Sequence, residues 1–100
     1  MTATLTRSFV ATLVAKPEHA DDVAKLLGQA AEMAQAEVGT IVWYALRSDE
    51  TTFWIVDAFE TEDARQSHIN GPIAAALMAN AHLLAEPPAI RPADVLAAKV

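Results

Sequence analysis

The stretch that decides the fold is FWIVDAFETEDARQSH, which runs from Phe53 to His68. Large apolar side chains of both parities fill its first half, and this pattern predicts a strand that is buried on both faces. Thr61 is a suitable helix cap, and the acidic residues that follow it suit the positive end of a helix dipole. The stretch therefore predicts a strand that turns directly into a helix, with Asp57 on the strand and His68 about two turns into the helix.

Asp57 and His68 form the one pair in the sequence that indicates chemistry rather than packing. Histidine has an ordinary pKa of about 6.5, so it can accept a proton at neutral pH, and a neighbouring carboxylate can orient its ring. The alternative is structural, because a buried acid also pairs with a cation or caps backbone N–H groups, and a helix histidine can steady helix-on-sheet packing. We name His68 and Asp57 as candidate catalytic residues and leave this alternative open.

Composition excludes several classes of function. A chain of 100 residues suits a single domain over residues 1–100. A net charge of −6 without a Lys/Arg cluster argues against a nucleic-acid partner. Cysteine is absent and the three histidines lack metal-ligand spacing, so we expect no metal site. Since no membrane-length apolar run and no leader-like N-terminal pattern is present, we expect a cytoplasmic protein without a membrane partner.

The rest of the chain predicts strands and helices in the order β-α-β-β-α-β. Gly39 is expected to close the first helix in a left-handed conformation, and Gly71 to cap the helix that Pro72 follows. Pro92 places the last strand at a sheet edge. The expected strands cover residues 8–15, 40–47, 53–59 and 89–96, and the expected helices cover residues 18–38, 61–70 and 72–86.

With right-handed crossovers, this order gives an α+β fold, the ferredoxin-like split βαβ arrangement with a four-stranded antiparallel sheet. If Arg47 pairs near Thr52, then Trp43 shares a face with Trp54. Both faces of the hairpin are apolar under this pairing, although helices can cover only one of them. We therefore expect a homodimer in which two sheets pack face to face and close a dimeric α+β barrel.

Three segments resemble the antibiotic biosynthesis monooxygenase family, a set of dimeric α+β barrels. They are residues 37–43, residues 53–59 and residues 64–68. The family pattern as it stands here is a Glu-x-Gly turn at 37–39, an aromatic at Trp43, an acid and an aromatic at 57 and 59, and Ala-x-x-x-His ending at His68. The chain departs from the pattern in having Asp at 57 where Glu is usual, Trp at 43 where Tyr is usual, and Ile73 in place of a second histidine.

The resemblance implies oxidation of a quinol or polycyclic phenol by molecular oxygen, without flavin or metal and hence without a cofactor. Such an enzyme needs an apolar, aromatic-lined cavity and a base that makes the phenolate. The alternative function is a non-catalytic dimer that binds a small molecule or is purely structural. Candidate substrate-binding residues are Trp43, Tyr44, Phe53, Trp54 and Phe59, with Asn70 and Arg91 as polar contacts, although the aromatics also suit a core, Asn70 a turn and Arg91 a surface ion pair.

Overall fold

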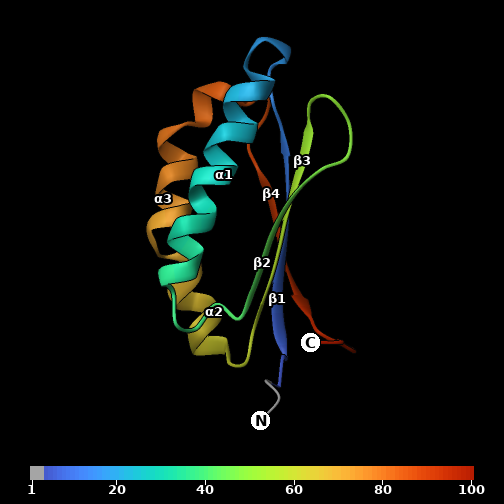
Figure 1. Cartoon of the computed structure of the whole chain (residues 1–100), viewed down its shortest axis with the longest axis vertical. Coiled ribbons are helices and arrows are strands. Elements are labelled where there is room, and N and C mark those ends of the chain that lie inside the picture. Colours follow the sequence, from blue (N-terminus) through green and yellow to red (C-terminus); the bar gives the residue numbers. More distant parts are fainter. Residues whose placement is uncertain (1–3) are drawn as a thin grey trace.

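The computed structural model describes residues 4–100 and shows a four-stranded antiparallel sheet with its helices packed against one face (Figure 1). The strand order is β2-β3-β1-β4, so β4 lies at an edge as predicted. The predicted ferredoxin-like α+β fold is confirmed. The elements are β1 Arg7–Val14, the 3₁₀ turn η1 Pro17–His19, α1 Ala20–Ala36, β2 Val42–Arg47, β3 Thr52–Phe59, α2 Glu62–Ile69, α3 Pro72–Ala79, the 3₁₀ turn η2 Ala81–Leu83 and β4 Ala89–Asp94.

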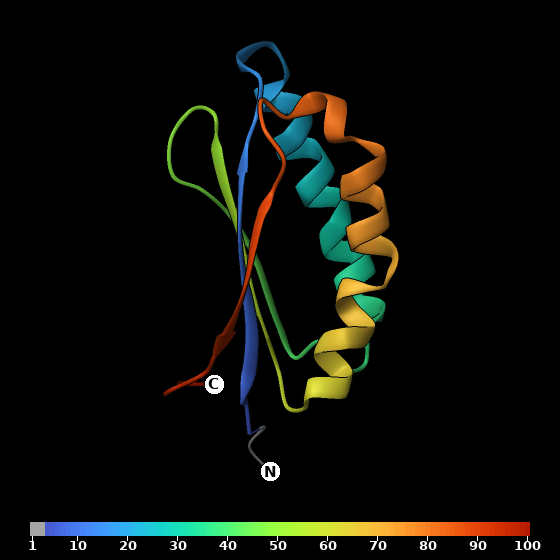
Figure 2. The same ribbon diagram turned by 180° about the vertical axis from the view of Figure 1, so that it is seen from behind.

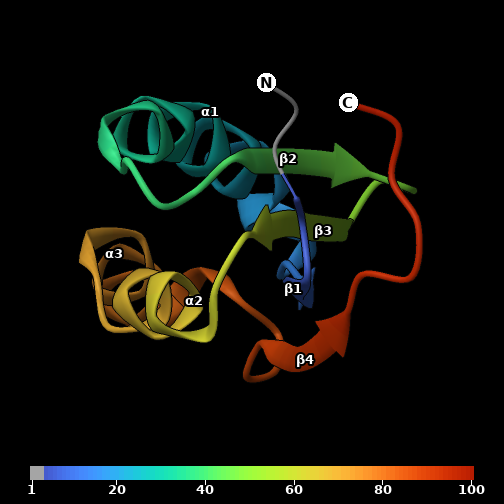
Figure 3. The ribbon, with the colours of Figure 1, turned by 90° about the horizontal axis from the view of Figure 1, so that it is seen from below.

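The core lies between the helices and the sheet. Helix α1 buries apolar side chains at helical spacing, among them Val23 and Leu27, against strand residues such as Leu13, Phe53 and Ile55. The opposite sheet face is covered by no helix or strand of residues 4–100 (Figures 2 and 3). In that same range, no helix is long and apolar enough to cross a membrane.

The predicted hairpin register is wrong by one residue. Arg47 lies opposite Phe53 rather than Thr52. Asp49 sets this register, because its Oδ1 accepts hydrogen bonds from the backbone N–H groups of Thr51 and Thr52, at 3.0 and 2.9 Å. Since side chains alternate along a strand, the one-residue shift moves every side chain of β2 to the opposite face. The side chain of Trp43 therefore lies on the helix-covered face, opposite Asp57 in the ladder.

Two glycines play different parts from those predicted. No described residue has a positive φ, so Gly39 is not a left-handed cap. Helix α1 ends at Ala36, and Gly39 is needed for space, because a Cβ there would lie 3.0 Å from the Cβ of Ala64. Gly71 does not end α2 either: Asn70 is the C-cap of α2, and Gly71 is the extended N-cap of α3.

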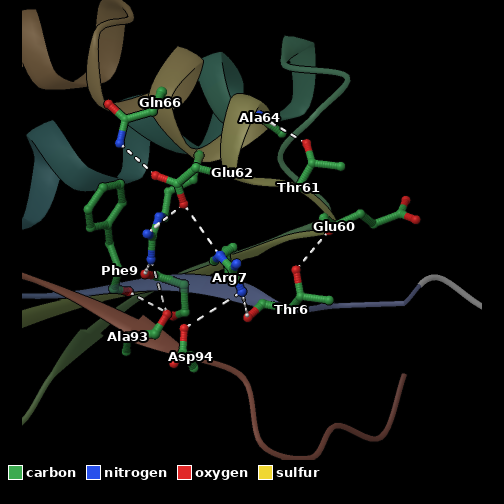
Figure 4. Close-up of polar contacts among 12 residues, drawn as sticks. Thr6, Arg7, Phe9, Glu60, Thr61, Glu62, Ala64, Gln66, Ala93 and Asp94 are labelled. Atoms are coloured by element: carbon green, nitrogen blue, oxygen red, sulfur yellow. Dashed lines mark hydrogen bonds and ion pairs between the residues drawn. The ribbon is translucent and has the colours of Figure 1, made fainter.

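Arg65 attaches helix α2 to two strands. Its Nη1 donates to the backbone carbonyls of Ser8 on β1 and Ala93 on β4, at 3.2 Å each. Its Nη2 lies 2.6 Å from the carboxylate of Glu62, within the polar network that Figure 4 shows. These contacts fix the position of α2 on the sheet, and with it the position of His68.

Candidate functional site

His68 is brought to the sheet by the way helix α2 begins. The Oγ1 of Thr61 accepts a hydrogen bond from the backbone N–H of Ala64 at 3.1 Å (Figure 4), which caps the helix as predicted. About two turns later, His68 faces inward, and its ring packs against Phe59 with ring centroids 5.2 Å apart. A polar helix residue is thereby buried between helix and sheet.

Both ring nitrogens of His68 face carboxylates. Nδ1 lies 2.6 Å from Oε1 of Glu37, and Nε2 lies 3.2 Å from Oδ2 of Asp57. The other oxygen of Asp57 accepts a hydrogen bond from the backbone N–H of Phe9 at 2.7 Å. A carboxylate only accepts hydrogen bonds, so two such contacts favour an imidazolium ring that donates from both nitrogens. Phe9 N–H, Asp57, His68 and Glu37 thus form one hydrogen-bonded chain.

The charge state of His68 follows from this environment. Burial lowers the pKa of His68, because the charged ring loses hydration. The hydrogen bonds and negative charges of Asp57 and Glu37 act in the opposite direction and prevail, so the pKa of His68 lies above its usual value. The site therefore favours a cation held between two anions.

Glu37 lies at the outer end of this series of polar contacts, next to a cavity. Its Oε1 also accepts a hydrogen bond from Oγ1 of Thr40 at 2.7 Å, whereas Oε2 is buried and has no hydrogen-bond partner among residues 4–100. Side-chain exposure falls from 18% at Glu37 to 8% at His68 and 2% at Asp57. The cavity measures about 200 Å³ and is lined by Glu37, Val38, Gly39, Thr40, Ala64, Ser67, His68 and Pro72.

A second cavity of about 250 Å³ lies between α1 and the edge strand β2. Thr40 lines both cavities, so they lie next to each other. The indole Nε1 of Trp43 is buried and has no hydrogen-bond partner among the described residues. This cavity is lined by Ala31, Ala34, Gln35, Thr40, Ile41, Val42, Trp43 and Tyr44.

The structure brings only part of the predicted site together. Asp57, His68 and Phe59 are in contact on the helix-covered face, and Trp43 lies across the ladder from Asp57. Phe53 lies on the same face but farther along β3, in the core beneath the guanidinium of Arg47, which is 5.0 Å from its ring centroid.

The remaining predicted residues lie away from His68. Tyr44, Trp54 and Arg91 occupy the uncovered face or its edges, and Nε1 of Trp54 donates to Oγ of Ser48 at 2.8 Å. Asn70 is exposed at the end of α2, where its Nδ2 donates to the carbonyl of Gln66 at 3.0 Å. These positions do not form one pocket with the buried acid and imidazole.

Glu37 and Thr40 belong to the polar cluster but were not predicted from the sequence as site residues. The sequence feature that could have indicated them is the Glu-x-Gly turn at 37–39, but this pattern is also typical of a helix end. The contact between Glu37 and His68 spans 31 residues of sequence, so local periodicity does not reveal it. In the part of the chain described here, no group of three or more acidic, His or Cys side chains is placed to hold a metal ion.

The chain is similar to a known protein family and to solved structures. The family model described as antibiotic biosynthesis monooxygenase matches residues 7–80. A solved protein of unknown function from Nitrosomonas europaea is 44% identical, with a TM-score of 0.95 over 99% of this chain and 97% of that one. Another solved protein, from Caulobacter crescentus and described as a candidate antibiotic biosynthesis monooxygenase, is 24% identical, with a TM-score of 0.80 over 95% of this chain and 93% of that one. Among curated proteins, none matches this chain.

Proposed function

Since this chain belongs to the antibiotic biosynthesis monooxygenase family, we propose that it is a cofactor-independent monooxygenase that oxidises a quinol or polycyclic phenol with molecular oxygen. The observation that carries the proposal is the buried chain of Asp57, His68 and Glu37 beside a cavity. Acid and imidazole groups held in this way are suited to moving a proton.

The reaction balances without an added reductant. Removing the proton of a phenolic hydroxyl leaves an electron-rich phenolate, which oxygen can oxidise. One oxygen atom enters the ring and the other leaves as water, so that a quinol becomes a hydroxylated quinone and supplies all the electrons itself. The tasks left to the protein are to take up the proton, hold the ring and exclude water.

Trp43 is the aromatic residue best placed to hold the ring. Its buried N–H has no protein acceptor among the described residues, and leaving such a donor unpaired costs about 1–3 kcal/mol. A phenolate or quinone oxygen in the adjoining cavity would accept that hydrogen bond. Phe59, which packs on His68, would form an apolar wall.

Oxygen uptake with a panel of reduced quinones tests the proposal. We expect His68→Ala to lower the rate by about 10²- to 10⁴-fold, the range that a general base contributes, because it breaks the polar cluster that would take up the proton. His82→Ala is the matched control, because His82 is exposed in η2, away from the cavity. The melting temperature of each preparation should be measured in parallel to show that the variants are folded. Absence of uptake by the unmodified protein across the whole panel would contradict the proposal.

The alternative is a non-catalytic dimer that binds a small molecule or is purely structural, and one observation favours it. Both nitrogens of His68 are occupied and its ring is buried, as expected of a group that ties α2, β3 and the turn after α1 together. Under this alternative, His68→Ala lowers the melting temperature and leaves any activity per folded molecule unchanged. The same two measurements therefore separate the two functions.

We further propose that the protein is a homodimer joined through the uncovered sheet face. That face carries large apolar side chains, with Tyr44 59% and Leu46 50% exposed in the single chain. Trp54 and Val56 lie beside them on β3. Two such faces packed together would bury this surface and form a dimeric α+β barrel.

The expected location of the protein is the cytoplasm.

A further inference from the structure

We propose that Oε2 of Glu37 is the atom that takes the proton from the substrate, and that His68 and Asp57 are positioning residues behind it. This inference rests on the proposed function and identifies the group that touches the substrate. It assigns to Glu37 a catalytic role that the sequence pattern placed on His68.

His68 is not free to accept a proton in this arrangement. Nδ1 at 2.6 Å from Glu37 and Nε2 at 3.2 Å from Asp57 each face an acceptor oxygen, and this geometry favours a ring that is protonated on both nitrogens. An imidazolium has no lone pair to offer. The ring would first have to break one of its two contacts and lose a proton before it could act as a base.

Glu37 has the acceptor that His68 lacks. Its Oε1 receives hydrogen bonds from His68 and Thr40, whereas its buried Oε2 receives none from residues 4–100. A buried polar atom without a partner is rare and requires an explanation. Glu37 and His68 line the cavity but Asp57 does not, so Glu37 is the carboxylate that an entering hydroxyl meets.

The charged groups around Glu37 leave its Oε2 unpaired within residues 4–100. His68 on α2 is its cationic neighbour, and Asp57 on β3 shares that cation. Helix α1 has no basic residue in its last turn, and helix α3, which begins beside the cavity, has no titratable residue at all. Arg65 on α2 is paired with Glu62 instead. No lysine or arginine among the described residues forms an ion pair with Glu37.

The proton transfer is a single balanced step. The substrate O–H bond breaks, its proton binds Oε2 of Glu37, and the bonding electron pair stays on the substrate oxygen as a phenolate. The net charge of the site and substrate together is unchanged. His68 remains an imidazolium throughout, and it holds Oε1 so that Oε2 keeps its direction.

The test uses Glu37→Gln in the full-length protein. The amide oxygen of glutamine can still accept hydrogen bonds from His68 and Thr40, but it is not a base. Glu32→Gln is the matched control, because it makes the same chemical change at an exposed position of α1 that lines neither cavity. The probe is 2-hydroxyanthraquinone, whose visible absorption shifts when its hydroxyl ionises. Circular dichroism and melting temperature show whether each variant is folded.

We expect the folded wild-type protein and Glu32→Gln to ionise the bound probe below the pH at which it ionises in water, and Glu37→Gln to bind it without ionising it at that pH. With a quinol that the wild-type protein oxidises, Glu37→Gln should lose about 10²- to 10⁴-fold in the rate of oxygen uptake. Ionisation of the probe by Glu37→Gln as in the wild type, or absence of ionisation in the wild type, would overturn the inference. The protein could ionise the probe only when Glu37 is intact and yet show no oxygen uptake with any quinol. In that case Glu37 remains the proton acceptor and the monooxygenase proposal fails.

Discussion

At the scale of the residue, His68 makes folding depend on pH. Its pKa is raised in the folded protein by Asp57 and Glu37 against the opposing effect of burial. A raised pKa means that the folded state holds the proton more tightly than the unfolded state. The stability that this provides is complete below the unfolded pKa of about 6.5 and is lost as pH rises through the folded pKa.

We therefore predict that the free energy of unfolding decreases from about pH 6.5 upward, by about 1.4 kcal/mol for each unit by which the folded pKa exceeds the unfolded one. Urea unfolding at a series of pH values between about 6 and 9 measures this decrease, because the range begins near the ordinary pKa of histidine. His68→Gln should remove the decrease, because glutamine does not titrate. An equal decrease in wild type and variant would show that other groups cause it.

At the scale of the element, the turn after α1 depends on close approach to α2. A Cβ at Gly39 would lie 3.0 Å from the Cβ of Ala64, whereas a Cβ at Gly28 would meet nothing within 4 Å. Gly39→Ala pushes the turn away from α2 and should lower the free energy of unfolding by about 1–3 kcal/mol, the usual cost of overpacking.

Gly28→Ala is the matched control on the same segment of chain. Gly28 is exposed within α1, where alanine is a better helix former, so this change should raise stability by about 0.5–1 kcal/mol. Thermal and urea unfolding of the two variants would give opposite signs. If Gly39→Ala were as stable as Gly28→Ala, the turn would have room to move and Glu37 would not be held against His68 by packing.

At the scale of the whole molecule, the uncovered sheet face makes the dimer testable. Leu46→Asp places a charge on that face, where it would be buried without a partner in a dimer, so we expect a monomer. Met78→Asp is the control, because Met78 is 80% exposed on α3, on the other side of the sheet. Sedimentation or light scattering at micromolar concentration gives the masses. A monomeric wild type, or a dimer that Leu46→Asp leaves intact, would contradict the sheet-to-sheet arrangement.

Local patterns in the sequence predicted most elements, because each pattern repeats within its own element. The helix expected over residues 72–86 is the exception, since α3 ends at Ala79 and the 3₁₀ turn η2 follows it. The apolar spacing of α1 and the turn residues at 70–72 marked helices and their limits. The pairing of strands was less predictable. Arg47 could pair with either of two neighbouring residues by pattern alone, and the side-chain bonds of Asp49 in the loop decided which.

The sequence by itself determined the order of strands and helices, the edge position of β4 and the presence of one acid and one histidine in buried settings. Only the tertiary structure decided which residues surround that histidine. Glu37 and His68 meet across 31 residues of chain, and Trp43 reaches the helix-covered face through the hairpin register. The physical reason is that hydrophobic periodicity records which side of an element is buried, whereas a hydrogen bond between distant side chains depends on how the elements are placed against one another.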